Sequence, residues 1–199
     1  MSHVSRLGRR ACAGSVLTIL CVISAARQVT AEQNPIRKLF GDRDVSYKTF
    51  KDPAGRFEIE FPDKDWRLLL SGGASLAVFA RNDGPALYVD HVRLMDTLTP
   101  GEIGALPETE VDLLRKQEPQ TKDFKSDMLE GKSGRGVLIK YSRPVKGPAS
   151  VVQYSVAVGQ DLYRLNGVVP ERVFSKYEPI IMHMIQSFKA LAAPPSPKN

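Results

Sequence analysis

Cysteine is almost absent from this chain. The only two, Cys12 and Cys21, both lie within the first 31 residues. If those residues are removed on export, the remaining protein has no disulfide, thiol nucleophile, thiolate metal ligand or covalently attached haem. Its stability must then come from a hydrophobic core, which a domain of about 140 residues can supply.

Histidine is nearly as scarce, which limits acid–base and zinc chemistry. Beyond the first 31 residues only His91 and His183 remain, and two isolated histidines do not match zinc-site spacings. His91 follows Asp90 in a strand-like run, so their side chains should point to opposite faces and cannot form a base–orienter pair. We place His183 on the solvated side of a helix. We therefore predict no enzyme, catalytic residue, cofactor or metal site.

Two familiar catalytic or phosphate-binding motifs are incomplete. Gly-Lys-Ser in "EGKSGRG" (130–136) lacks the glycine that a phosphate-binding loop needs at position 126, which is serine. A Gly-x-Ser-x-Gly elbow does not occur. We interpret 130–136 as the turn of a β-hairpin.

The chain also lacks a run of charge of one sign. The formal net charge is +6, but residues 1–31 carry four arginines and no acidic residue. The remainder has 24 basic and 22 acidic side chains, which are interspersed. Neither the near-neutral balance nor the dispersed pattern favours nucleic acid binding.

The first 31 residues resemble a secretory signal peptide. Arg6, Arg9 and Arg10 precede an apolar run at 11–26, and "VTA" (29–31) supplies small residues for cleavage. The run is shorter than the roughly 20 residues that span a bilayer. We predict cleavage after Ala31 and a periplasmic or extracellular protein. Cleavage after Ala26 and an uncleaved anchor remain alternatives.

The remaining residues divide into three parts. We expect a linker at 32–46 that includes a short helix, a single domain at 47–190 and a disordered proline-rich tail at 191–199. Short connectors with turn residues separate the strand-like runs of the domain, so neighbouring strands should be antiparallel. These runs are 47–51, 56–61, 66–70, 75–80, 86–94, 124–129, 136–142, 150–158 and 162–169.

Two helices are expected. The first spans about 100–118, with Thr99 as N-cap, Pro100 at its first position and Pro119 after its end. The second spans about 171–190, where apolar residues recur at spacings of three and four and form a core-facing stripe.

Acidic pairs offer weak candidates for calcium. Asp42 and Asp44, and Asp63 and Asp65, lie in predicted linker or turn segments, but no twelve-residue calcium loop is present. Glu58 and Glu60 share a strand face opposite Phe57, Ile59 and Phe61. We expect them to meet water or a basic neighbour.

Residues 57–66 and 184–191 resemble the PsbP-like domain family. The resemblance rests on an alternating strand, a proline and a tryptophan, and on a closing "IQSF" segment; the signature residues are Phe57, Ile59, Phe61, Pro62, Trp66, Ile185, Ser187 and Phe188. It implies an α+β fold with an antiparallel β-sheet packed between helices, an α/β/α sandwich. The same fold occurs in a eukaryotic Ran-binding nuclear import factor.

The resemblance carries no catalytic motif. It favours an exported, non-catalytic accessory domain that acts on an unidentified protein partner in the cell envelope or outside the cell, without disulfides; peripheral contact with the membrane stays open. The alternative is a small-ligand or calcium-binding protein, with a cavity lined by Tyr88, Tyr141, Tyr154, Arg93 and Arg164. An unrecognised hydrolase would require His91 to contact a serine and a carboxylate other than Asp90.

Overall fold

Antiparallel strands dominate the computed structural model, which describes residues 45–69, 75–144 and 147–191. The leader, most of the linker with Asp42 and Asp44, and residues 192–199 of the tail lie outside the described residues, as do 70–74 and 145–146. Seven strands form a large sheet in the order β3-β4-β5-β9-β8-β7-β6. Their bounds are β3 Trp66–Leu69, β4 Ser75–Arg81, β5 Ala86–Arg93, β6 Lys122–Gly131, β7 Gly134–Arg143, β8 Ala149–Val158 and β9 Asp161–Pro170.

A second, three-stranded sheet packs on one face of the large one. Its order is β1-β2-β10, with β1 Tyr47–Lys51, β2 Phe57–Pro62 and β10 Lys189–Ala190. The sequence did not predict this second sheet. Strands that follow each other in the chain were expected to be antiparallel neighbours, but the consecutive strands β2 and β3 belong to different sheets.

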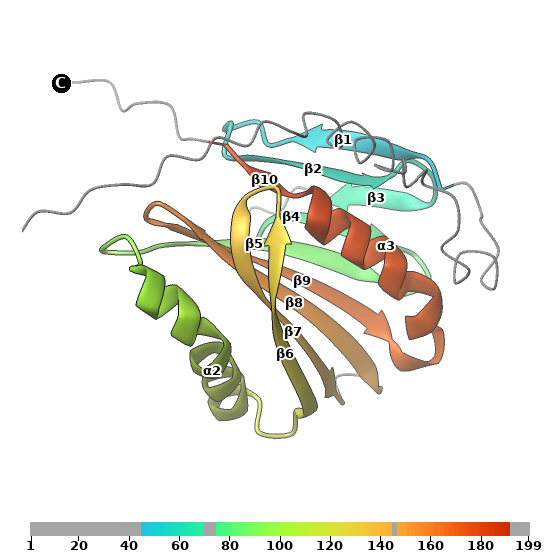
Figure 1. The fold of residues 1–199 in the computed structure, drawn as a ribbon. Helices are drawn as coiled ribbons and strands as arrows, with labels where there is room; N and C mark the ends of the chain where they lie inside the picture. Colours follow the sequence, from blue (N-terminus) through green and yellow to red (C-terminus); the bar gives the residue numbers. More distant parts are fainter. Residues whose placement is uncertain (1–44, 70–74, 145–146, 192–199) are drawn as a thin grey trace, which may run out of the picture. The chain divides into compact units, whose positions relative to one another are not determined.

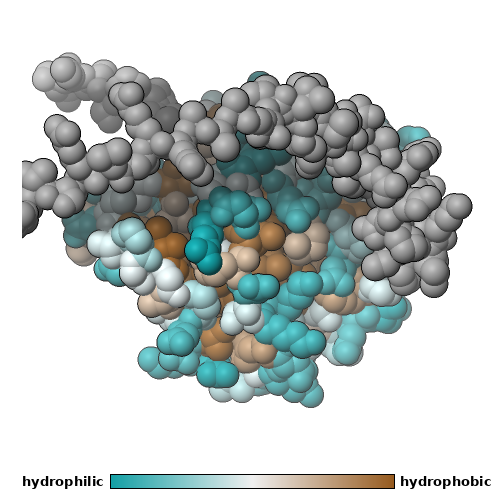
Figure 2. Space-filling view, in the orientation of Figure 1, coloured by the Kyte–Doolittle hydropathy of each residue, from teal (hydrophilic) through white to brown (hydrophobic). Residues whose placement is uncertain are grey.

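The two helices lie on opposite sides of the large sheet (Figure 1), which confirms an antiparallel sheet packed between helices. Helix α2 (Pro100–Gln117) packs Leu106, Val111 and Leu114 against β7 and β8. Helix α3 (Phe174–Ser187) shares the other face with the small sheet. Figure 2 views the domain from the same side: hydrophobic side chains gather in the middle, and mostly hydrophilic ones line the lower margin.

Local sequence explains α2. Thr99 Oγ1 accepts a hydrogen bond from the backbone N–H of Glu102, and the Glu102 carboxylate accepts one from the backbone N–H of Thr99. This capping box satisfies two amides that a helix start leaves free. The predicted helix at 100–118 is confirmed to within one residue.

The predicted helix at 171–190 is partly wrong. Residues Glu171–Val173 form a 3₁₀ turn, α3 ends at Ser187, and the chain then runs extended into β10. The apolar stripe does face the core, since Tyr177, Ile181, Met184 and Ile185 are buried. Gly167 on β9 lets the helix lie close, because a Cβ there would clash with Cγ2 of Ile181.

Candidate functional site

The signature residues lie in and around the main core. Phe57, Ile59, Phe61, Trp66, Ile185 and Phe188 are buried in one cluster beneath the small sheet and α3, and Pro62 ends β2. Ser187 Oγ accepts a hydrogen bond from the backbone N–H of Glu60 at 3.0 Å and donates one to the carbonyl of Met184 at 2.8 Å. It joins the last turn of α3 to β2, which gives the "SF" motif a packing role.

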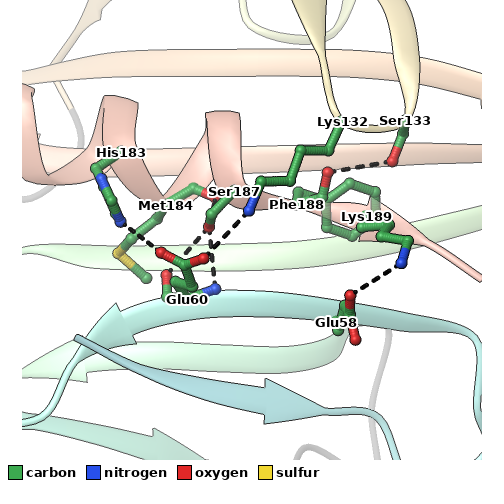
Figure 3. A network of polar contacts seen from close by, with 9 residues as sticks. All are labelled: Glu58, Glu60, Lys132, Ser133, His183, Met184, Ser187, Phe188 and Lys189. Carbon is green, nitrogen blue, oxygen red and sulfur yellow. Dashed lines mark hydrogen bonds and ion pairs between the residues drawn. The ribbon is translucent and has the colours of Figure 1, made fainter.

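A polar network surrounds Glu60 on the same side of the domain (Figure 3). The two carboxylate oxygens meet Lys132 Nζ at 3.1 Å and His183 Nε2 at 2.9 Å. Glu58 is 3.3 Å from Lys189. Both glutamates therefore have basic neighbours, as expected.

The position of His183 differs from the prediction. Its side chain is 42% exposed and its ring stacks on Tyr47 at 3.8 Å between centroids, so it lies half-buried against β1 and β2. A helical wheel cannot show this contact, because the partner comes from a distant strand.

The Glu60 network should make stability depend on pH. The hydrogen bond from Lys132, and next the one with His183, hold the pKa of Glu60 below its ordinary value. A lowered folded-state pKa means that the stabilisation is present above the ordinary glutamate pKa and is lost as pH falls through the folded pKa. We expect Lys132→Met to lower the free energy of unfolding by about 0.2–1 kcal/mol at neutral pH, since the pair is half-exposed.

Urea unfolding of both proteins at pH 7 and pH 3 measures this effect. The difference should disappear at pH 3, and Lys125→Met on exposed β6 is the matched control. An equal difference at both pH values would rule out the ion pair as its cause.

The other histidine, His91, has one of the two contacts that a hydrolase would require, a carboxylate other than Asp90. Its Nε2 lies 2.8 Å from Asp161 Oδ1, and its ring packs against Tyr163. A serine hydroxyl is not among its partners in the described part of the chain. Asp161 is also bound by Arg93 at 2.7 Å. Burial by itself would raise the pKa of Asp161, but the hydrogen bonds with Arg93 and His91 outweigh it and hold the pKa below its ordinary value.

Among the described residues, the turn carboxylates of Asp63 and Asp65 do not belong to a cluster that could bind a metal ion. Asp63 accepts a hydrogen bond from Ser46, and Asp65 is mostly exposed beside Arg81. Within residues 45–69, 75–144 and 147–191, no three His, Cys, Asp or Glu side chains are placed to hold a metal ion.

A cavity of about 300 Å³ lies between α2 and the large sheet. We call it the α2 cleft. Leu113, Leu114 and Gln117 of α2 form one wall, while Val151 and Val168 form an apolar part of the floor. Further lining comes from polar side chains of β5, β7, β8 and β9. Sheet and helix thus leave open space where a fully packed layer would have none.

Two ion pairs border the α2 cleft, one from the middle of the helix and one from its C-cap, Glu118. Glu110 is only 3% exposed and meets Arg164 Nη2 at 2.7 Å, while Gln153 Nε2 donates to it at 2.8 Å. Glu118 lies 3.3 Å from Arg143 Nη1. Because eight residues separate the two glutamates, the ion pairs stand about 12 Å apart along the helix axis.

The sequence identified part of this lining. Tyr88, Tyr141 and Arg164 line the α2 cleft as expected. Tyr154 lies on the opposite face, where its hydroxyl donates to the carbonyl of Gly134, and Arg93 binds Asp161 at the end of β5; both expectations were wrong. Glu110 was not among the predicted lining residues, although its position on the buried stripe of α2 was an available signal.

Beside α2 the sheet is not covered by a described helix or strand. Residues directly opposite on neighbouring strands share a face, and Leu69, Val78, Tyr88 and Asn166 form such a row. Leu69 is 53% exposed, Tyr88 36% and Val92, on the same face of β5, 42%. We call Leu69, Val78, Tyr88 and Val92 the open half-face.

No described helix is long and apolar enough to span a membrane. No protein-family model matches the chain. No curated protein matches it in sequence.

Solved structures do resemble it. Cyanobacterial PsbP (CyanoP) from Synechocystis sp. PCC 6803 matches with a TM-score of 0.57 and 12% identity, over 75% of this chain and 95% of that one. LpqN of Mycobacterium tuberculosis, involved in cell envelope biogenesis, matches with 0.57 and 15% identity over 79% and 97%. The Saccharomyces cerevisiae Ran-binding protein Mog1p matches with 0.50 and 11% identity over 72% and 95%. The described residues therefore have the PsbP-like α+β fold, as the signature residues predicted.

Proposed function

We propose that this protein is an exported, non-catalytic accessory domain that docks a partner protein of the cell envelope through the open half-face. The carrying observation is that α2 packs over the β6–β9 side of its sheet face, leaving Leu69, Tyr88 and Val92 exposed beside it. Apolar side chains gathered on a surface and not used by the core mark interaction sites.

The composition of this region suits a protein partner. Tyrosine and methionine are enriched at protein interfaces, and Met95, which follows β5, is 94% exposed next to the open half-face. A pleated sheet presents a flat surface on which a helix or another sheet of a partner can pack.

Structures of the same fold support a binding role. Mog1p is a Ran-binding protein, and LpqN is involved in cell envelope biogenesis. The signal-like leader supports the proposal that the protein is exported and that the mature protein begins at Glu32. Calcium binding gains no support from the described carboxylates, whereas small-ligand binding is favoured by the α2 cleft.

Site-specific photocrosslinking in cells tests the docking surface. A photoreactive residue at Leu69 or Val92 should crosslink one dominant envelope protein, while the same residue at exposed Lys125 on β6 should not. The crosslink from Leu69 should disappear when Val92→Asp is added.

Mass spectrometry of the purified protein checks that its first residue is Glu32.

Two results would contradict the proposal. Equal crosslinking from Lys125 would show that the contact is non-specific. An absence of crosslinks from both apolar positions, in cells where the protein is folded and exported, would show that the open half-face has no protein partner.

A further inference from the structure

Two of the three carboxylates that line the α2 cleft are paired with an arginine. Arg164 binds Glu110, and Arg143 binds Glu118 at the other end of the cleft. The third carboxylate, Asp90, accepts hydrogen bonds from Ser75 and Asn166. Both arginines are already paired and the lining has more carboxylates than cations, so the electrostatics of the cleft disfavour an anionic ligand.

The hydrogen-bonding groups that remain free in the cleft include both donors and acceptors. Gln153 and Asn166 direct their amide N–H groups to carboxylates, of Glu110 and Asp90 respectively. The amide oxygens have no hydrogen-bond partner in the described structure and are left as acceptors. Arg164 engages Glu110 through Nε and Nη2, which leaves Nη1 as a donor.

Two tyrosine hydroxyls add groups that both donate and accept. Tyr141 and Tyr88 line the cleft, and neither hydroxyl has a hydrogen-bond partner among the described residues. Burial raises the pKa of Tyr141 to about 12, so this hydroxyl stays protonated at physiological pH. A hydroxyl without a partner in the protein can form a hydrogen bond with a ligand that enters the cleft.

We propose that the α2 cleft binds a neutral, polyhydroxylated molecule, a saccharide unit, with Tyr88 and Tyr141 bonding its hydroxyls. A hydroxyl both donates and accepts, so it can satisfy amide oxygens, phenols and a guanidinium N–H together. The apolar floor of Val151 and Val168 suits the C–H faces of a sugar ring. The volume of about 300 Å³ is at the lower end of the range for small-molecule sites.

The same chemistry could come from a free sugar or from the sugar head of a glycolipid or envelope glycan. The α2 cleft and the open half-face share Tyr88, so the two tests depend on residues that only one of them contains. Leu69 and Val92 lie outside the cleft, and Tyr141 lies outside the open half-face. Failure of one test therefore leaves the other intact.

The test is a titration of the exported protein, ¹⁵N-labelled, followed by NMR. Neutral probes are glucose, galactose and maltose, and the charged probe of similar size is the anion glucuronate. We expect saturable shifts at Tyr88, Gln153 and Asn166 with a neutral sugar, and at least tenfold weaker binding of glucuronate. Vesicles that carry a galactolipid compete with the sugar if the natural source is a lipid head and do not compete if it is soluble.

Two variants should keep the fold, and each should remove one hydrogen bond between the protein and the sugar. Tyr141→Phe and Tyr88→Phe each delete a hydroxyl that has no hydrogen-bond partner among the described residues, so stability should not change while affinity falls about two- to tenfold, the worth of one hydrogen bond. Tyr154→Phe, on the opposite face, is the matched control and should leave affinity unchanged. The absence of saturable shifts with every neutral sugar, or equal binding of glucuronate, would overturn the proposal.

Discussion

Replacing Arg164 by methionine should lower the free energy of unfolding by about 3–5 kcal/mol, because it leaves a buried carboxylate without its cation. Glu110 is 3% exposed, and Arg164 supplies a two-nitrogen contact to it, with Nη2 at 2.7 Å and Nε at 3.2 Å. Methionine keeps most of the aliphatic stem, so the loss measures charge and not packing. Urea unfolding followed by circular dichroism gives the value.

A second variant separates this cause from general damage to the sheet. Adding Glu110→Gln to Arg164→Met removes the stranded charge, and the neutral amide should recover much of the loss. Lys140→Met removes a half-exposed pair with Glu178 and should cost no more than about 1 kcal/mol. If Arg164→Met costs as little as Lys140→Met, water in the cleft solvates Glu110, and the pair is not a buried one.

Trp66→Ala should also cost about 3–5 kcal/mol, since it removes the largest side chain from the main core. Trp66 begins β3 and is 5% exposed, in the same cluster as Phe57, Phe61 and Phe79. The small sheet packs over this part of the large one, so the cavity would lie between the two sheets and could not be closed by one side chain.

The measurement is urea unfolding by far-ultraviolet circular dichroism, because Trp66 is the only tryptophan and its fluorescence would be lost. Leu69→Ala, on the same strand but 53% exposed, is the control and should change stability by no more than about 0.5 kcal/mol. Similar losses for both variants would show that β3 contributes through its pairing with β4 and not through burial of Trp66.

Local chemistry made much of the fold predictable. The Thr99 cap with Glu102 fixes the start of α2, and the turn at 131–134 joins β6 to β7 as a hairpin. Turn residues and alternation located the strands of the large sheet, with ends that differ by a few residues. The bounds of the domain, the leader and the tail stay predictions, as does export.

Long-range contacts decided what the sequence could not. An apolar helical stripe predicts that α3 is buried, but it cannot show that Phe188 leaves the helix so that Lys189 and Ala190 pair with β2. That pairing joins residues about 130 positions apart, and no local pattern encodes it.

The α2 cleft also combines features that the sequence predicts with features that only the tertiary structure decides. Strand alternation separates the two faces of each strand, but the register between strands decides which side chains meet. Asn166 opposite Tyr88 and Gln153 is a result of pairing β9 with β5 and β8. By itself the sequence determined the strands other than β10, and the first helix. Only the tertiary structure decided the second sheet, the open half-face and the paired charges of the cleft, because each depends on contacts between segments far apart in the chain.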